Sequence, residues 1–327
     1  MYLAGDVGGT KTALALYEPT SDGIKQVREQ VFPSQDHGSL EAILTEFLKD
    51  HPAGALKSAC FGVAGPVIEG RCQTTNLPWV LEEKTLASAL GVKRAKLLND
   101  LEAAAYGMLH VKPDELVALN PKAPARRKGN VALIAAGTGL GEAMLYWDGE
   151  RYHPIASEGG HADFAPRDDL QVGLLQYLRE SYGAHVSYER VLSGPGFFNI
   201  YEYLRDRGHY PESSQVAEQM KTGDPNAAIS QHGLSGDDPL CKATIDLFCS
   251  VYGAEAGNIA LRCMAIGGVF IGGGIAPKLL PALTSGLFWS QFIEKGRFVE
   301  LLKGIEVNVV LNPRTPLLGA AYYALQL

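Results

Sequence analysis

Three glycine-rich loops carry the residue types that hold phosphate in this sequence. The residues concerned are Asp6, Gly8, Gly9, Thr10 and Lys11 in the first loop, Gly137, Thr138 and Gly139 in the second, and Gly273 and Gly274 in the third. Exposed backbone N–H groups in such turns form a concave nest for anionic oxygens, glycine permits close approach, and threonine adds a side-chain donor. A nucleoside triphosphate held between two lobes fits three loops of this kind.

Each loop taken alone has an ordinary structural explanation. Gly8 and Gly9 also suit a tight hairpin, because hairpin turns favour residues that tolerate positive φ. Two common phosphate motifs are excluded: no Gly-Lys-Ser/Thr follows the first loop, and the second loop lacks the third glycine of the dinucleotide pattern and leads into a strand. Asp6 can orient a magnesium ion through its water shell or form a turn by bonding its own backbone, and both interpretations remain open.

Asn99 and Asp100 stand where an apolar strand pattern changes into a helical pattern. Asn and Asp are preferred helix N-caps, and Asn99 with Glu102 forms a variant of the capping box. A carboxylate at a helix N-terminus is also kept ionised by the helix dipole, and an alcohol that attacks phosphate needs an ionised carboxylate to accept its proton. A capping role and a general-base role are therefore compatible at this junction.

Glu158, His161 and Glu189 form a second polar group. Glu158 and His161 lie in a glycine-flanked turn, and Glu189 lies near the start of a short helix that Ser187 can cap. Singly, these side chains suit exposed polar positions. Together they suit a pyranose, whose adjacent hydroxyls a carboxylate and an imidazole can bridge.

The elements that must position these residues alternate between strand and helix, which predicts an α/β layered fold. Each of the first two glycine loops connects two strands, and the third precedes a helix that is expected to begin near Pro277. The last strand and helix are expected to return to the lobe that is built first. Other expected helices cover residues 38–51 with Ser39 as N-cap, 81–91 ending at Gly91, and 238–264, whereas 209–226 and the short basic run 125–128 are expected to be loops.

Composition indicates an ordinary soluble globular chain of 327 residues, with 46% hydrophobic and 20% charged residues. The net charge of −7 and scattered Lys and Arg give no footprint for nucleic acid or an anionic membrane. We expect no leader peptide and no membrane span, since no apolar run approaches the ~20 residues required. The five cysteines show no CxxC spacing, so we expect reduced, buried thiols and a cytoplasmic location.

The ordered set of motifs DVGGTKT, LLNDLEA, AAGTGLGEA, SEGGHADFAP, SYERVLSG and FIGGGIAPK resembles the bacterial ATP-dependent glucokinases of the actin, hexokinase and heat-shock-70 superfamily. The resemblance spans nearly the whole chain. It implies a two-lobed, actin-like (ribonuclease H-like) α/β fold with a sugar in the interlobe cleft, ATP across the two hairpin loops, Mg²⁺ and commonly a homodimer. We expect a small domain of residues 1–109 plus 302–327 and a large domain of 110–301. The zinc-bearing cysteine cluster of a neighbouring group of sugar kinases is missing after His161, so no structural zinc is expected.

The same resemblance implies a role for each polar residue. Asp100 would be the catalytic base, with Asn99, Glu158, His161 and Glu189 binding D-glucose beside it, while Asn76 would touch the closed cleft. The implied reaction converts ATP and D-glucose to ADP and glucose 6-phosphate. Three rivals remain: a kinase for another hexose, a sugar-sensing regulator without turnover, and a protein-remodelling ATPase. The sequence leaves no room before Gly5 for the DNA-binding helices of a regulator, and a remodelling ATPase would not need Glu158, His161 and Glu189.

Overall fold

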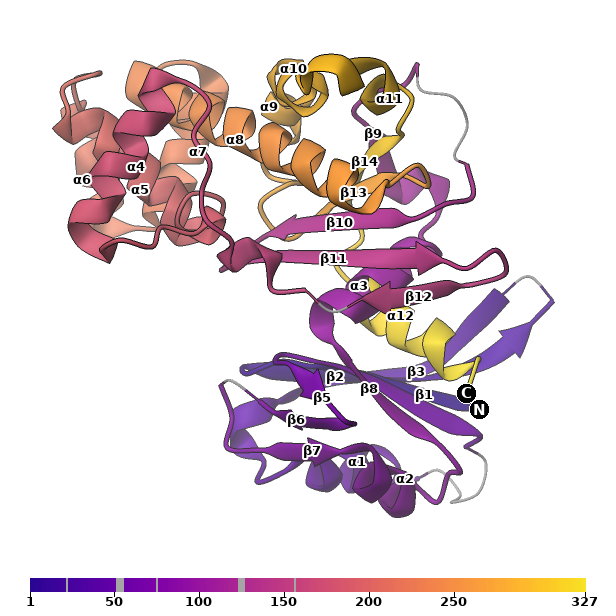
Figure 1. Cartoon of the computed structure of the whole chain (residues 1–327). Coiled ribbons are helices and arrows are strands. Elements are labelled where there is room, and N and C mark those ends of the chain that lie inside the picture. The colour runs from indigo at the N-terminus through magenta and orange to yellow at the C-terminus, as the bar shows by residue number, and fades with distance from the viewer. Residues whose placement is uncertain (22, 51–55, 75, 123–126, 156) are drawn as a thin grey trace. The chain divides into compact units, whose positions relative to one another are not determined.

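The structure, a computed structural model, describes all residues except 22, 51–55, 75, 123–126 and 156. The chain forms two compact units (Figure 1). Unit 1 comprises Met1–Pro113, Arg151–Ala156 and Asn312–Leu327, and unit 2 comprises Asp114–Glu150 and Ser157–Leu311. In the described residues, no helix is both long enough and apolar enough to cross a membrane.

Unit 1 is built on a five-stranded sheet in the order β3-β2-β1-β4-β8. The strands of this sheet are β1 (Tyr2–Val7), β2 (Lys11–Thr20), β3 (Gly23–Pro33), β4 (Ser58–Val63) and β8 (Ala95–Asn99). A separate three-stranded sheet consists of β5 (Val67–Ile68), β6 (Arg71–Gln73) and β7 (Val80–Glu82), and the residues of unit 1 also include β12 (Tyr152–Ile155). Its helices are α1 (Leu40–Phe47), α2 (Glu83–Leu90), α3 (Asp100–Met108) and α12 (Thr315–Ala324). The antiparallel β1–β2 hairpin and the parallel strands β1, β4 and β8 confirm the predicted strand–turn–strand start and the α/β alternation.

The period-two alternation of strand side chains separates two cores in unit 1. Leu3 packs with α1 and α2 on one face of the sheet, whereas Ala4 packs with α3 and α12 on the other. Asp6 follows Ala4 by two residues and so points to the face that carries α3. The predicted caps are present, because Ser39 accepts a hydrogen bond from the N–H of Ala42 and Gly91 ends α2 in the left-handed conformation.

In unit 2, the strand order is β11-β10-β13-β14-β9. The strands are β9 (Leu116–Ala118), β10 (Val131–Ala136), β11 (Leu140–Trp147), β13 (Val269–Gly272) and β14 (Val307–Val310). The helices are α4 (Asp169–Tyr182), α5 (Gly194–Asp206), α6 (Ser214–Thr222), α7 (Pro225–Ser235), α8 (Pro239–Cys263), α9 (Leu280–Leu283), α10 (Leu287–Ile293) and α11 (Val299–Lys303).

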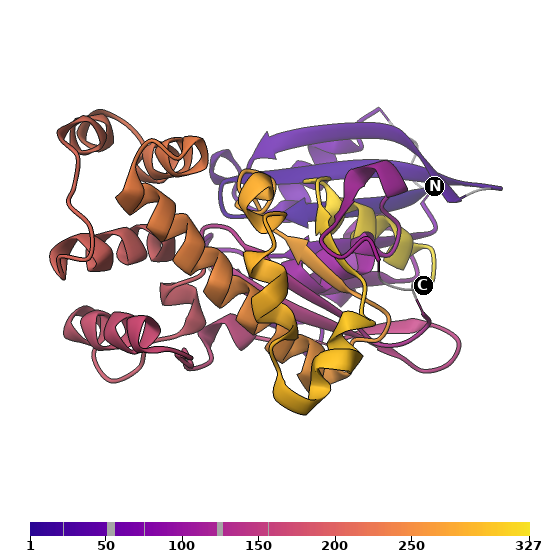
Figure 2. The same ribbon diagram turned by 90° about the horizontal axis from the view of Figure 1, so that it is seen from above.

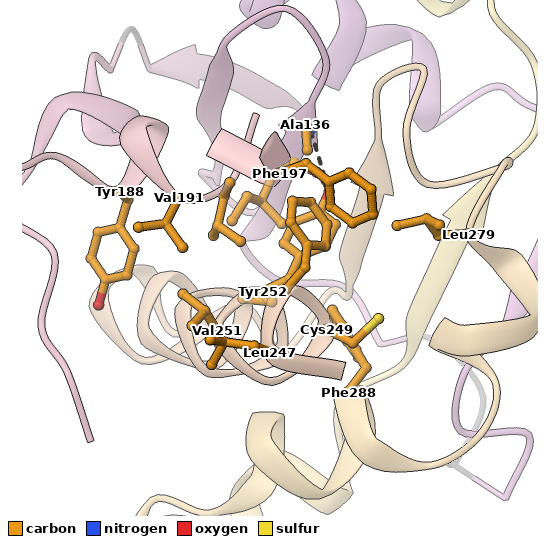
Figure 3. Packing of buried hydrophobic residues seen from close by; sticks show 14 of the residues in the cluster. Ala136, Tyr188, Val191, Phe197, Leu247, Cys249, Val251, Tyr252, Leu279 and Phe288 are labelled. Carbon is orange, nitrogen blue, oxygen red and sulfur yellow. Dashed lines mark hydrogen bonds between the residues drawn. The ribbon is translucent and has the colours of Figure 1, made fainter. Parts of the chain in front are cut away.

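The long helix α8 (Figure 2) contributes many of the buried apolar side chains in the core of unit 2. Its Tyr252 is fully buried among apolar side chains (Figure 3), and its hydroxyl accepts a hydrogen bond of 3.3 Å from the N–H of Ala136 at the end of β10. Cys241 and Cys249 of α8 are buried free thiols, as are Cys60 and Cys72, and Cys263 is half-buried and free. The expected burial is confirmed for four of the five cysteines.

Several local predictions are wrong. Residues 302–311 lie in unit 2 because β14 pairs with β13, so the chain returns to unit 1 only at Asn312. Residues 209–226 contain α6, which Ser213 caps and which buries a single apolar residue, so its sequence carries little helical periodicity. The segment after the third glycine loop forms turns over residues 273–279, where the N–H of Leu279 bonds to the carbonyl of Ile275, and α9 begins only at Leu280. The basic run 125–128 lies partly outside the described residues.

Candidate active site

The first glycine loop is a braced hairpin in unit 1. The N–H of Gly8 donates to the Lys11 carbonyl at 3.0 Å, which closes the turn. Buried Ser34, which sequence reasoning missed, donates from Oγ to the Gly8 carbonyl at 2.8 Å and from its N–H to the Thr10 carbonyl at 3.0 Å. A Cβ atom on Gly9 would lie 2.5 Å from Cβ of Asn76, so Asn76 packs against this loop.

Asp6 and Asp100 are brought to one end of the unit 1 sheet. Asp6 pairs with Gly62 of β4, and the next β4 residue, Val63, pairs with Asn99 at the end of β8. A Cβ atom on Gly62 would lie 2.9 Å from Cβ of Ala103 and 3.8 Å from Cα of Asp100, so the missing side chain allows α3 to pack closely. Burial first, and then the negative charge of Asp100, raise the pKa of Asp6 to about 6, while Lys11 opposes the shift.

The structure assigns the helix cap to Asn99. Asn99 Oδ1 accepts from the N–H of Leu101 at 2.9 Å, and Glu102 Oε2 accepts from the N–H of Asn99 at 2.8 Å, which confirms the predicted capping box. Asp100 is the first residue of α3, where its Oδ1 also accepts from the N–H of Leu101 at 2.9 Å. Asp100 therefore stands at the positive end of the helix dipole without being the cap.

The second and third glycine loops meet at a cavity of about 620 Å³ in unit 2. The cavity is lined by Gly137, Thr138, Gly194, Pro195, Phe197, Asp224, Asn226, Ala227, Ser230, Gly274, Ile275, Lys278 and Leu279. Gly137 is joined to the start of α5 by a hydrogen bond of 2.8 Å from the N–H of Gly194. A Cβ atom on Gly137 or Gly274 would meet no atom within 4 Å, so the fold itself does not require glycine there.

Gly139 and Gly273 are not among the cavity-lining residues. A Cβ atom on Gly273 would lie 2.2 Å from the Ala136 carbonyl, and its φ of +81° favours glycine. A Cβ atom on Gly139 would lie 2.5 Å from Glu189 Oε2. The fold therefore needs glycine at position 273 for its own packing, whereas a side chain at position 139 would displace the carboxylate of Glu189.

Sequence reasoning missed most of the cavity wall. Its polar members include Asn226, whose Nδ2 donates to the Gly194 carbonyl at 3.0 Å. The Oδ1 atom of Asn226 is buried and has no hydrogen-bond partner in the described part of the chain. Asp224 caps α7 and precedes Pro225. The signals available were the Ser-Gly-Pro-Gly start of α5 and the Gly-Asp-Pro-Asn start of α7, each of which has a capping residue followed by a proline in the first turn.

The expected sugar-binding residues of unit 2 lie on two short 3₁₀ helices. Glu158 directly precedes Gly159–His161, and Glu189 is the middle residue of Tyr188–Arg190. The two segments are joined by the hydrogen bond from the N–H of Tyr188 to the Ala162 carbonyl, at 3.0 Å. His161 Nδ1 lies 4.0 Å from Glu189 Oε1.

Glu189 is also tied to the second glycine loop, because its Oε2 accepts from the N–H of Leu140 at 3.1 Å. Ser187 makes no side-chain capping bond, so that part of the prediction is wrong. The helix is a single 3₁₀ turn, and the Ser187 backbone forms an antiparallel bridge with Asp163.

The arrangement thus comprises two carboxylates at a sheet edge in unit 1, and a glycine-lined cavity with a nearby Glu–His pair in unit 2. Residues 3–327 match the family model described as glucokinase. The chain belongs to the glucokinase family. A glucokinase from Trichormus variabilis is 40% identical over 345 residues, covering 100% of this chain and 99% of that protein. A glucokinase from Synechocystis is 41% identical over 349 residues, covering 99% and 98%.

Solved glucokinase structures share the fold. The crystal structure of a glucokinase from an Antarctic psychrotroph superposes with a TM-score of 0.87 at 30% identity, covering 100% of this chain and 99% of that one. A ROK family glucokinase from Streptomyces griseus, crystallised with glucose and AMPPNP, gives a TM-score of 0.61 at 20% identity and covers 99% of both chains. These glucokinases confirm the predicted α/β actin-like ATPase fold, and the family relationship supports glucokinase activity, an ATP-dependent phosphotransfer to a sugar.

Proposed function

We propose that the protein transfers the γ-phosphoryl group of ATP to the 6-hydroxyl of D-glucose, giving glucose 6-phosphate and ADP. We further propose that it acts in the cytoplasm, where reduced cysteines are stable, and as a homodimer. Beyond family membership, the observation that carries the proposal is the position of Asp100 in the first turn of α3, next to a separate capping residue. The helix N-terminus favours the ionised carboxylate that a base requires.

In this proposal Asp100 accepts the proton of the 6-hydroxyl as that oxygen attacks phosphorus. Asn99, Glu158, His161 and Glu189 bind the sugar hydroxyls. The Glu189 carboxylate, already fixed by the N–H of Leu140, retains Oε1 for a hydroxyl. A site that pairs each hydroxyl rejects sugars that lack one, because its own polar groups would then be left without partners.

The unit 2 cavity suits the nucleoside part of ATP. Pro195, Phe197, Ile275 and Leu279 provide apolar contact for a base, and the unpartnered Oδ1 of Asn226 is an acceptor for an amino or hydroxyl group. The open backbone at Gly137 and Gly274 permits phosphate oxygens to approach. In unit 1, Gly8, Gly9, Thr10 and Lys11 would contact phosphate at the hairpin.

The residues around Asp6 fit a magnesium ion. Carboxylate oxygens are the ligands that Mg²⁺ prefers, and Asp6 would hold the ion through water. Burial first, and then the negative charge of Asp100, raise the pKa of Asp6, and a bound cation would oppose both effects. The ion would neutralise charge on the transferred phosphoryl group.

The proposal is tested by a coupled assay of the purified protein over a panel of hexoses and phosphoryl donors. Glucose 6-phosphate and ADP should form fastest from D-glucose, ATP and Mg²⁺. Faster turnover of another hexose would instead favour a kinase for that sugar on the same scaffold. Glucose binding without any turnover would favour the regulator. Light scattering of the same preparation would test the dimer.

A further inference from the structure

A buried polar network lies in unit 2 beneath the expected sugar-binding residues. Glu142 of β11 and Glu255 of α8 are 2% and 0% exposed. Arg262 Nη1 donates to Glu255 Oε1 at 2.6 Å and lies 3.9 Å from Glu142 Oε2. Asn258 Nδ2 donates to the other Glu255 oxygen at 2.7 Å. Two buried carboxyl groups thus share one arginine.

Each carboxyl group supports one of the two sugar-binding segments. A Cβ atom on Gly159, the residue after Glu158, would lie 2.3 Å from Glu142 Oε2, so the turn rests directly on this carboxyl group. Tyr188, the residue before Glu189, accepts at its hydroxyl from Asn258 Nδ2 at 3.3 Å, on the residue that also bonds Glu255. The Gly159 backbone beside Glu158 and the Tyr188 ring beside Glu189 therefore both contact the same buried polar network.

The protonation state of Glu142 follows from the same surroundings. Burial first, and then the negative charge of Glu255, raise the pKa of Glu142 to about 8, while Arg262 opposes the shift. The same surroundings favour a proton on the Glu142–Glu255 pair at neutral pH, with Glu142 as the carboxyl group whose pKa is raised. Glu142 Oε1 has no hydrogen-bond partner among the described residues, which costs less for a carboxylic acid than for a carboxylate.

We propose that Glu142, paired with Glu255, is a positioning residue for glucose: it supports the Glu158–His161 turn and, through Glu255 and Asn258, the segment that carries Glu189. This inference rests on the sugar-binding roles proposed above. Ionisation of Glu142 would place two buried carboxylates against one arginine, which leaves one negative charge uncompensated, and would displace the turn. Glucose affinity should then weaken as pH rises through about 8, while ATP affinity should not, because Glu142 does not line the nucleotide cavity.

The test compares Glu142→Ala with Glu142→Gln. Removing the support should raise the glucose KM about tenfold or more, because small displacements of positioned groups are costly. The ATP KM should remain unchanged. Glutamine has the shape of the neutral acid, so Glu142→Gln should restore glucose affinity. It should also abolish the rise of the glucose KM above pH 8 that the unmodified protein shows.

The titration of Glu142 must be distinguished from that of the ionisable groups near it. These groups are Glu255 and Arg262 on α8, Tyr188 on the neighbouring 3₁₀ helix, and Lys295. Lys295 donates to Asn258 Oδ1 at 2.6 Å, and burial lowers its pKa to about 8. A pH effect that persists in Glu142→Gln but disappears in Lys295→Met would assign the titration to Lys295 and overturn the role of Glu142.

Loss of stability is controlled with Leu302→Ala, a buried change in α11. If it lowers the melting temperature as much as Glu142→Ala and raises the glucose KM equally, the effect is general destabilisation and the inference fails. An unchanged glucose KM in Glu142→Ala would also refute it. If the unmodified protein neither binds nor phosphorylates glucose, the proposed function itself fails, which is a separate outcome.

Discussion

The backbone of Gly139 lies so close to the carboxylate of Glu189 that a Cβ atom at position 139 would stand 2.5 Å from Oε2. The same oxygen accepts the N–H of Leu140. The second glycine loop and a proposed sugar ligand are therefore one packed unit, and a mutation in the loop can affect the sugar. Substitutions test nucleotide binding alone only at Gly137 and Gly274, where an added Cβ atom would meet no other atom within 4 Å.

The glycine variants should separate these roles. Gly137→Val and Gly274→Val each place a side chain in open space at the cavity wall. ATP affinity should fall about tenfold or more, because the side chain blocks the close approach of phosphate. Glucose affinity should be unchanged. Gly139→Val should weaken glucose binding as well, because it displaces Glu189. Calorimetry with ATP and fluorescence titration with glucose measure the two affinities. If Gly137→Val binds ATP normally, the second loop is only a turn.

Asp100→Asn should separate catalysis from folding. Asn99 and Glu102 retain the cap, so the loss of stability should not exceed the roughly 0.3–1 kcal/mol that a charge at a helix N-terminus contributes. Turnover should fall by ~10²–10⁴-fold, mostly in kcat, because asparagine cannot accept the proton.

Glu102→Ala is the matched control for Asp100→Asn, since it breaks the capping box but leaves the proposed base. It should cost about 0.5–2 kcal/mol of stability, with a much smaller loss of kcat. Near-normal turnover by Asp100→Asn would remove Asp100 from the mechanism.

Asp6 should make stability depend on pH. Its pKa of about 6 in the folded protein exceeds the ordinary value of 3.8, so between these values the folded state binds more protons than the unfolded state, and its contribution to stability falls as pH rises. Asp6→Asn should therefore be more stable than the unmodified protein at pH 8, by at most about 3 kcal/mol, and the advantage should shrink as pH falls through 6 toward 4. Urea unfolding at several pH values measures this difference.

The same carboxylate pair offers a second readout. Asp100→Asn removes the neighbouring charge and should lower the pKa of Asp6, as measured by carboxyl NMR titration. A pKa of Asp6 that does not move in this variant would show that burial alone causes the shift.

The features that sequence predicted best are those with local causes. The two hairpins, the cap at Ser39 and the Asn99–Glu102 capping box follow from residue types within a few positions of one another, and all are present. The order of the glycine motifs identified the family because those motifs occur together in it. Gly137, Thr138 and Gly274 do converge on one cavity.

The features that were missed depend on contacts far apart in sequence. Ser34 braces the first loop across 26 residues, and Asn226 reaches Gly194 across 32, so neither is visible in a local pattern. The boundary at 302 was misplaced because β14 pairs with β13 rather than with a strand of unit 1. The burial of Glu142 beneath Gly159 is likewise a product of tertiary packing.

The C-terminal helix should control the proposed base through packing against α3. A Cβ atom on Gly319 of α12 would lie 1.8 Å from the Ala103 carbonyl, and one on Gly107 of α3 would lie 2.0 Å from the Thr315 carbonyl, so the two helices touch backbone to backbone. Gly319→Ala must push them apart, which should cost about 1–3 kcal/mol or more. Since α3 begins at Asp100, kcat should fall as well.

The matched control is Gly38→Ala, because a Cβ atom on Gly38 would meet nothing within 4 Å. Its free energy of unfolding should change by no more than about 0.5 kcal/mol, as is usual for surface substitutions. Thermal melting and steady-state turnover of the two variants form the comparison. If Gly319→Ala melts and turns over like Gly38→Ala, α12 can shift without cost, and the close helix contact does not hold α3 in place.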